Sequence, residues 1–378
     1  MEDATTYKLG DISTMKYGKL PPKYINEGNY PIWSGYRYVG KCNEYNCNKG
    51  DIIIVARGVG GTGDVKIAKE DCYLTNLSIQ VKLDKNICQP EYFYYSYLLS
   101  NLKYLDSGSA QSQITIEDLK RLEVTLPPLE QQHKITDILK FIDEKIELNR
   151  QINDNLEQQA QALYKSWFID FEPFKDGKFV ESGIGLIPEG WKVGTLSDLA
   201  EITMGQSPSG KSYNECGEGI LFYQGRAEFG DRYPSIRLYT TEPSRIAEQN
   251  SVLLSVRAPV GDTNIAYNQC CIGRGLASIK AKHGFNSFIF YTVSALKDQF
   301  DMYNGEGTVF GSINKDSLSS MSVIVPPISI IRDYEKIVAP LDLKYKNLFT
   351  ESTLLTKQRD ALLPKLMSGE LKINEIDC

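Results

Sequence analysis

The side chains that most often perform acid–base chemistry are scarce in this sequence. Histidine occurs only as His133 and His283, and His133 falls in the opening turn of a predicted helix. A histidine in that place is more often a surface or capping residue than a general base. Neither a serine nucleophile elbow nor the phosphate-loop pattern Gly-x4-Gly-Lys-[Ser/Thr] occurs in the chain. The sequence therefore predicts a protein without a catalytic centre of its own.

One glycine-rich segment could in principle hold a dinucleotide. Gly58–Gly63 fits the spacing Gly-x-Gly-x-x-Gly after a strand, but that fingerprint requires a helix directly afterwards. Asp64–Ala68, which follows, has the pattern of a second strand, and the later counterpart Arg257–Asp262 lacks the glycine spacing. We interpret the segment as a turn.

Cysteine usage gives no metal site. Cys42, Cys47, Cys72 and Cys88 lack the regular spacing of zinc ligands, and so does the pair Cys270–Cys271. The chain starts without a basic leader or an apolar export segment, and no apolar run approaches the roughly 18 residues that span a bilayer. We expect reduced thiols in a cytoplasmic protein without membrane contact.

Internal duplication organises the chain. Four segments recur in the same order at a spacing of roughly 190 to 200 residues: Leu9–Ile12 with Leu196–Leu199, Asp51–Arg57 with Ser251–Arg257, Pro90–Tyr95 with Asn286–Tyr291, and Val124–Pro128 with Val323–Pro327. One such match could arise by chance, but four in order indicate a tandem repeat.

Each half divides into a mixed part and a long helix. We expect a mixed α/β (α+β) fold, with strands at Asp51–Ala56, Leu77–Val81 and Val252–Val256 and helices at Glu91–Leu102 and Phe288–Phe300. A Pro-Pro pair, which ends a strand and suits a helix start, precedes each long helix. The predicted boundaries are 1–127 and 173–327 for the mixed domains, with 128–172 and 328–378 for the helices.

The long helices carry apolar residues at heptad spacing. On the first helix these are Ile135, Ile142, Leu156 and Leu163, with Asn149 as the polar member, and on the second they are Leu341, Leu348, Leu355 and Leu362. A seam this narrow suits another helix better than a sheet. We therefore expect the two helices to pair as an antiparallel coiled coil; two separate surface helices are the alternative.

Several segments resemble one known family. They are Gly108–Ile114, Leu126–Gln132, Ile135, Leu139, Asp143–Ile146 and Gln358–Leu371. Together with the tandem layout, they are similar to the specificity subunit of type I restriction-modification enzymes. The second half departs from the pattern at Tyr303–Thr308 and Pro327–Ile331.

The resemblance implies a DNA-reading subunit without catalysis. In this family two target recognition domains each read half of a bipartite DNA site, and the paired helices set the spacer. It also implies modification subunits that methylate adenine with S-adenosylmethionine, and restriction subunits that translocate and cut with ATP and Mg²⁺. No cofactor is expected in this chain.

Loop residues with cationic or amide side chains are the candidates for contacting DNA. Arginine and lysine suit guanine and phosphate, and asparagine and glutamine suit adenine. In the first domain the candidates are Lys16, Lys19, Lys23, Ser34, Tyr36, Arg37, Arg57, Thr75, Asn76, Ser109, Gln111 and Gln113. In the second they are Gln206, Lys211, Gln224, Arg226, Arg257, Arg274, Thr308 and Ser312. Because Arg57 and Arg257 recur after equivalent strands, a structural role is the alternative for them.

Two other readings remain open. The chain could be a methyltransferase or nuclease with its own active site, but the Asn-Pro-Pro-Tyr and Asp-Pro-Pro-Tyr motifs of amino-methyltransferases are missing. It could also be a scaffold whose repeated domains bind proteins. The net charge of −6 argues against indiscriminate nucleic-acid coating, although one face can still be basic.

Overall fold

The computed structural model describes residues 4–20, 28–58, 61–106, 112–304 and 311–371. The chain forms two compact units, each described here by itself. Unit 1 comprises Met1–Arg150 and Thr350–Cys378, and unit 2 comprises Gln151–Phe349. Both contain part of each long helix, α3 (Leu129–Phe168) and α8 (Ile328–Ser368). No helix in the described ranges is long and apolar enough to cross a membrane.

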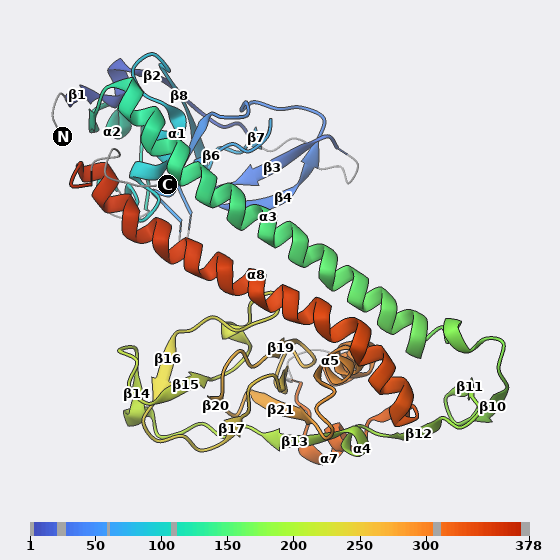
Figure 1. Cartoon of the computed structure of the whole chain (residues 1–378). Coiled ribbons are helices and arrows are strands. Elements are labelled where there is room, and N and C mark those ends of the chain that lie inside the picture. The colour runs from blue at the N-terminus through green and yellow to red at the C-terminus, as the bar shows by residue number, and fades with distance from the viewer. Residues whose placement is uncertain (1–3, 21–27, 59–60, 107–111, 305–310, 372–378) are drawn as a thin grey trace. The chain divides into compact units, whose positions relative to one another are not determined.

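Unit 1 has a four-stranded sheet of order β2-β8-β5-β6, a three-stranded sheet of order β4-β3-β7 and the pair β1-β9 (Figure 1). Its strands are β1 (Thr5–Lys8), β2 (Ser13–Tyr17), β3 (Tyr30–Ser34), β4 (Arg37–Cys42), β5 (Ile52–Val55), β6 (Val65–Ile67), β7 (Tyr73–Leu74), β8 (Ser78–Leu83) and β9 (Glu123–Leu126). Its short helices are α1 (Pro90–Ser96) and α2 (Ile116–Lys120). One face of β5 packs against α1 in a core that contains Ile52, Ile54, Tyr92 and Phe93.

Unit 2 repeats this plan with more strands. Its sheets have the orders β13-β21-β18-β19 and β14-β16-β15-β20-β17, with the pairs β12-β22 and β10-β11. The strands are β10 (Phe179–Ser182), β11 (Gly185–Pro188), β12 (Lys192–Thr195), β13 (Ala200–Met204), β14 (Tyr213–Asn214), β15 (Ile220–Tyr223), β16 (Leu238–Thr240), β17 (Ile246–Ala247), β18 (Val252–Ser255), β19 (Thr263–Ile265), β20 (Cys270–Ile272), β21 (Leu276–Ala281) and β22 (Ser322–Val325). The short helices are α4 (Leu196–Leu199), α5 (Asn286–Ala295), α6 (Lys297–Asp301) and α7 (Lys315–Ser319).

The shared strand order confirms the tandem repeat. In each unit the central strand, β5 or β18, lies antiparallel to both neighbours. Its residues are all buried and, apart from Ser255 at the end of β18, all apolar, as expected for a strand covered on both faces. The segment Asp64–Ala68 contains strand β6 and no helix. The interpretation of the preceding glycines as a turn therefore agrees with the fold.

Two predicted helices are shorter than expected. The helix predicted at Glu91–Leu102 ends at Ser96, because Tyr97 and Leu98 bond back by three residues to Tyr94 and Tyr95. The one predicted at Phe288–Phe300 is divided into α5 and α6 at Leu296 in the same way. These tight final turns replace the four-residue hydrogen bonds that would have continued each helix.

In each unit, α3 and α8 contact each other in opposite directions. In unit 1 the Asn149 side chain donates to Glu351 Oε2 at 2.8 Å and to Ser352 Oγ at 3.3 Å, and Arg359 Nη1 lies 2.7 Å from Asp143 Oδ1. In unit 2 Tyr164 packs edge-on against Tyr334, with the ring centroids 6.2 Å apart. A later α3 residue thus meets an earlier α8 residue within each unit, which makes the contacts antiparallel.

The predicted heptad residues lie on the inner sides of these helices to different degrees. Ile135 and Leu348 are buried. Leu163 and Leu341 pack at the edge of the unit 2 core, and Leu362 packs at the edge of the unit 1 core. Ile142, Leu156 and Leu355 are half-buried. A regular coiled coil over the full length of both helices stays a prediction.

A hydrogen bond from a buried tyrosine to a half-buried aspartate joins the mixed part of each unit to a long helix. In unit 1 the Tyr95 hydroxyl donates to Asp143 Oδ2 at 2.8 Å, and in unit 2 Tyr291 donates to Asp342 Oδ1 at 2.9 Å. Burial raises the pKa of both hydroxyls above the usual tyrosine value, so both stay protonated and act as donors. The equivalent pairs fix α1 on α3 and α5 on α8.

Candidate nucleic-acid interface

Backbone hydrogen bonds bring several predicted residues of unit 1 to one edge of its sheets. Lys19 N donates to Leu74 O at 3.1 Å, and Thr75 N donates to Trp33 O at 2.9 Å. Arg57 N donates to Leu77 O at 3.2 Å, and Arg57 also forms an isolated β-bridge with Gln113. The residues held together in this way are the polar rim of unit 1: Lys19, Ser34, Arg57, Asn76 and Gln113.

Unit 2 has the same network at equivalent positions. Gln206 N donates to Ile272 O at 3.0 Å, and Gly273 N donates to Tyr223 O at 2.8 Å. Arg257 forms an isolated β-bridge with Ser312, as Arg57 does with Gln113. The polar rim of unit 2 is therefore Gln206, Gln224, Arg257, Arg274 and Ser312, position for position. Every member of both rims had been a candidate from the sequence.

A glycine precedes the first rim residue in both units because the backbone passes too close for a side chain. A Cβ on Gly18 would lie 2.1 Å from Thr75 O, and one on Gly205 would lie 2.1 Å from Gly273 O. Contacts this short cannot be relieved, since the atom in the way belongs to the backbone. The sequence Gly-Lys in unit 1 and Gly-Gln in unit 2 thus marks the same structural position.

The last rim residue is placed by a helix cap. Gln113 lies two residues before Thr115, whose side chain accepts a hydrogen bond from Asp118 N in a capping box at the start of α2. In unit 2 Ser312 lies two residues before Asn314, whose side-chain oxygen accepts from Ser317 N at 2.8 Å at the start of α7. Each cap fixes the backbone two residues after the rim residue, and so helps to hold that residue beside the rim arginine.

Both rim arginines are exposed, and neither forms an ion pair with a described residue. Arg257 lines a cavity of about 410 Å³ together with Arg274, Gly205 and Ser312. Guanidinium groups with free donors beside hydroxyl and amide groups can bond bidentately to phosphates or to base edges. The rims therefore have the chemistry needed to contact a nucleic acid.

The remaining candidates of unit 1 surround the rim in different ways. Lys16 lines a small recess of about 190 Å³ with Lys19, Tyr45 and Asn46. Thr75 is buried, and its hydroxyl donates to Ser34 Oγ at 3.2 Å, so it positions Ser34. Asn76 is exposed.

Tyr36 lies in the tight turn between β3 and β4, and Arg37 is the first residue of β4. Arg37 Nε donates to the Tyr36 hydroxyl at 2.9 Å, and its guanidinium lies 5.2 Å from the centre of the Tyr36 ring. A Cβ on Gly61 would lie 2.8 Å from Tyr36 Cδ1. The described part of the glycine-rich turn is therefore packed against Tyr36.

In unit 2 Lys211 is exposed in a single 3₁₀ turn, Gly210–Ser212. Arg226 forms an ion pair with Asp262 that is open to solvent. An ion pair of this kind contributes little to stability, so Arg226 can exchange Asp262 for another anion at small cost. Lys23, Ser109, Gln111 and Thr308 lie outside the described residues.

Sequence reasoning missed Tyr45 and Asn46, which share the recess with Lys16 and Lys19. Asn46 is held by two bonds with Leu74: its amide donates to Leu74 O at 3.0 Å, and its oxygen accepts from Leu74 N at 2.8 Å. No repeated motif marks these residues.

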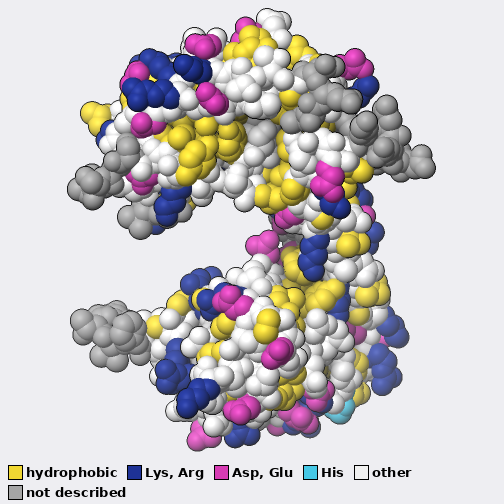
Figure 2. All heavy atoms as spheres, turned by 90° about the vertical axis from the view of Figure 1, so that its left-hand side faces the viewer, with side chains coloured by type: hydrophobic (Ala, Val, Ile, Leu, Met, Phe, Trp, Pro, Cys, Tyr) yellow, Lys and Arg dark blue, Asp and Glu magenta, His cyan; other side chains and the backbone are white. Residues whose placement is uncertain are grey.

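The described residues contain no cluster of three or more His, Cys, Asp or Glu side chains that could hold a metal. Six of their seven cysteines are buried, and the seventh, Cys216, is exposed. On the face drawn in Figure 2, Lys and Arg side chains form separate small groups in both units, with acidic side chains between them.

Comparisons with known proteins show the family of the chain. Residues 1–158 and 188–355 match the family described as "Type I restriction modification DNA specificity domain". A putative type I restriction enzyme MjaX specificity subunit from Methanocaldococcus jannaschii is 37% identical over 302 residues, which are 77% of this chain and 70% of that protein. The MjaIX specificity subunit of the same organism is 28% identical over 377 residues, covering 93% of this chain and 84% of the relative.

A solved structure supports the fold. The crystal structure of a type I restriction-modification S subunit from M. genitalium superposes with a TM-score of 0.65 at 18% identity and covers 96% of both chains. The family match covers the two repeated parts of the chain, and the MjaX relative covers 77% of the chain at 37% identity. The chain therefore belongs to the family of type I restriction-modification DNA specificity subunits, with two tandem recognition domains.

Proposed function

We propose that each polar rim contacts one half of a bipartite double-stranded DNA site. The observation that carries this proposal is the paired network of backbone hydrogen bonds, which holds five side chains at equivalent positions in two units. A duplicated chain mimics a two-fold dimer, and two-fold DNA readers contact two half-sites separated by a fixed number of base pairs. Mixed domains 1–127 and 173–327 would be the two readers.

The rims differ in a way that separates two roles. Arginine occupies the same position in both, as Arg57 and Arg257, whereas the other positions carry different side chains. A contact common to two readers of different sequences is best directed to phosphate, which every sequence presents. We therefore assign Arg57 and Arg257 to the DNA backbone.

The positions that differ are assigned to base recognition. In unit 1 these are Lys19, Ser34, Asn76 and Gln113, and in unit 2 they are Gln206, Gln224, Arg274 and Ser312. Arginine and lysine select guanine, and asparagine and glutamine select adenine, by paired hydrogen bonds in the major groove. The two rims would accordingly prefer different half-sites.

The helices α3 and α8 would set the spacer between the half-sites, since DNA rises about 3.4 Å per base pair along one strand. In this proposal the chain does not catalyse a reaction. It recruits modification subunits, which methylate adenine with S-adenosylmethionine, and restriction subunits, which use ATP and Mg²⁺ to translocate and cut. These activities belong to the partner subunits, and the complex would act in the cytoplasm.

Selection from a random DNA pool tests the proposal. The full chain, assembled with its modification subunits, is incubated with the pool at two salt concentrations, and the retained DNA is sequenced. The expected result is a motif of two short half-sites with a constant gap, retained less strongly at the higher salt. Enrichment of one uninterrupted motif, or of none, would contradict it.

A heptad inserted into both helices tests the role of the spacer. The same selection should then return the unchanged half-sites with a different gap. Altered half-sites would mean that the helices take part in base recognition.

A further inference from the structure

Strands β6 and β19 are equivalent and lie at the edge of their sheets. Ile67 lies opposite Ile52 in unit 1, and Ile265 lies opposite Val252 in unit 2. The next residue, Ala68 or Ala266, donates its amide inward at 2.9 Å, to Asp51 O or Ser251 O respectively. Because amides alternate along an antiparallel strand, the N–H groups of Ile67 and Ile265 both point away from the sheet.

In unit 2 the chain covers this edge with its own segment Phe229–Tyr233. Ile265 N donates to Arg232 O at 2.8 Å. The Asn264 side chain accepts from Gly230 N at 3.1 Å and donates to Gly230 O at 2.9 Å. The segment thus covers β19 through one backbone–backbone hydrogen bond and through two bonds between the Gly230 backbone and the Asn264 side chain.

The side chains of the segment pass to both faces of the sheet. Phe229 packs against the core of Leu253, Tyr223 and Cys270 on one face. On the other face the Arg232 guanidinium lies 4.9 Å from the centre of the Phe290 ring in α5. The edge strand is therefore wrapped from both sides.

Unit 1 has the same edge without the covering segment. The turn between β3 and β4 is short, with Ser34 paired to Arg37, whereas the equivalent connection in unit 2 runs from β15 to β16 and contains the covering segment. Among the described residues, no backbone hydrogen bond joins the outer side of β6 to another segment. A cavity of about 590 Å³ takes the place of the segment.

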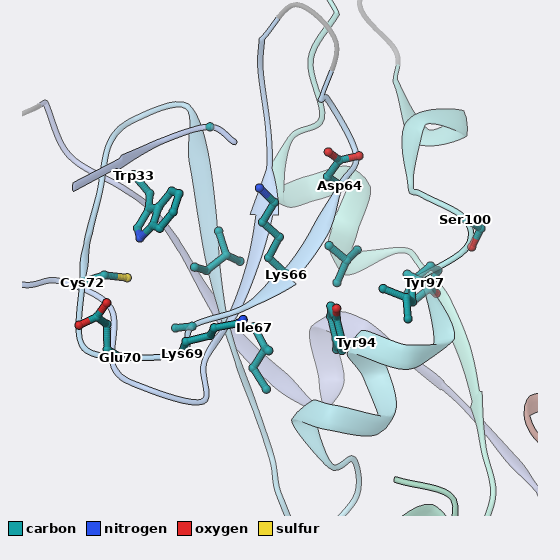
Figure 3. Close-up of a pocket in the computed structure, with 15 residues that line it drawn as sticks. Trp33, Asp64, Lys66, Ile67, Lys69, Glu70, Cys72, Tyr94, Tyr97 and Ser100 are labelled. Carbon is teal, nitrogen blue, oxygen red and sulfur yellow. The ribbon is translucent and has the colours of Figure 1, made fainter. Parts of the chain in front are cut away.

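This cavity extends around β6, as Figure 3 shows. Trp33 and Cys72 lie on one side of the edge strand, and Tyr94 and Tyr97 lie on the other. Trp33 and Cys72 correspond in position to Tyr223 and Cys270, on the face where Phe229 packs in unit 2. Tyr94 corresponds to Phe290, whose ring lies beside the Arg232 guanidinium. The lining is thus the unit 2 site without its occupant.

We propose that β6 is a docking site for an extended segment of a partner protein, which adds a strand to unit 1 and inserts an aromatic side chain between Trp33, Ile53 and Cys72. Three residues later, a long side chain lies on Tyr94 and Tyr97. The spacing follows from Phe229 and Arg232 in unit 2. Edge strands that stay uncovered tend to pair with other chains, and in unit 1 a partner supplies what unit 2 carries itself.

The charge of Lys66 also limits which partner segments fit the site. Lys66 replaces Asn264, and its ammonium lies 3.5 Å from Tyr36 O. A cation at this position accepts no hydrogen bond, so the partner must offer oxygen atoms there, from its backbone or from an acidic side chain. This docking does not depend on DNA recognition, because the rim residues Lys19, Arg57 and Gln113 do not line the cavity.

A fluorescent peptide that copies Arg226–Ser235 is the probe. Its binding to the full chain is followed by anisotropy, and the expected result is saturable binding at one site below about 1 mM. The same peptide with Phe229→Ala should bind about tenfold more weakly, since it loses the aromatic anchor. Equal binding of the two peptides would overturn the proposal, and so would no binding of either.

The matched protein variants are Ile67→Pro and Ile67→Ala. Proline removes the outward N–H at an edge position where sheets tolerate it, and should weaken the peptide by about tenfold. Alanine keeps the N–H, and the Ile67→Ala chain should bind the peptide to within about threefold of the unsubstituted chain. Thermal melting of each variant checks folding, and Trp33→Ala replaces Ile67→Pro if that variant fails to fold. The proposal is wrong if proline and alanine weaken the binding of the peptide equally. It is also wrong if duplex DNA displaces the bound peptide.

Discussion

The polar rims of units 1 and 2 share one backbone and differ in their side chains. Hydrogen bonds of 2.8 to 3.2 Å hold both rims at matching positions, and an arginine stands beside the same bridge in each. Elsewhere unit 1 presents lysine, serine, asparagine and glutamine where unit 2 presents two glutamines, an arginine and a serine. A scaffold defined by backbone bonds can therefore change its contacts without changing its fold.

The attachment of each unit to the long helices shows a second difference. In unit 2 the Arg232 side chain is 1% exposed and meets Asp342 Oδ1 at 2.6 Å as well as Glu157. In unit 1 the corresponding aspartate, Asp143, meets Arg359 from α8, whose side chain is 16% exposed. Unit 2 thus depends on a loop arginine that unit 1 does not need.

The largest expected effect comes from breaking that attachment. Arg232→Ala leaves two carboxylates partly buried without their cation, and should destabilise unit 2 by about 3–5 kcal/mol. Arg359→Ala should cost unit 1 roughly 1–3 kcal/mol, because water still reaches Asp143. Denaturant-dependent hydrogen exchange resolves the two units. An equal loss from both variants would show that the two attachments are equivalent.

A smaller effect is expected at the shared arginines. Arg57→Ala and Arg257→Ala should each weaken matched and mismatched DNA alike, by about tenfold, and lower the slope of log affinity against log salt by about 1. Gln224→Ser, which gives unit 2 the residue of unit 1, should alter sequence preference and leave the slope unchanged. Titrations over a range of salt measure both quantities. A loss of affinity for matched DNA alone would mean that the two arginines contact bases and not phosphates.

An effect that depends on pH concerns Glu335 in unit 2, where burial raises the carboxyl pKa to about 7 although Phe288 N donates to it at 2.8 Å. The folded state then binds more protons than the unfolded state between the ordinary glutamate pKa and about 7, so stability falls as pH rises through this window. Glu335→Gln should remove this fall. Melting temperatures of the two proteins from pH 5 to 8 test this prediction. Parallel curves of melting temperature against pH would contradict it.

Much of the fold could be predicted because the repeated sequence segments form buried strands. Asp51–Arg57 and Ser251–Arg257 match where β5 and β18 are buried on both faces, so an apolar run survives in both halves. The Pro-Pro pairs predicted the start of both long helices to within one residue. Asn149, the polar residue of the first seam, is buried and bonded to α8.

The site was harder to predict, because hydrogen bonds between distant loops assemble it. Lys19 and Leu74, or Arg57 and Gln113, have no sequence spacing that indicates contact. The Phe229–Tyr233 segment resembled an ordinary polar loop, since its arginine is buried only by residues of three other elements. The pairing of Arg226 with Asp262 had no signal either, because the two residues are far apart in the sequence.

Exchange of the side chains assigned to base recognition shows whether the rims determine the two half-sites. Gln206→Lys, Gln224→Ser, Arg274→Asn and Ser312→Gln give unit 2 the rim of unit 1, and methylated adenines are then mapped in cells that carry the chain and its partner subunits. One half-site is expected to change toward the sequence of the other, while the second half-site and the gap stay the same. Unchanged methylation, or a change in both half-sites, would contradict it.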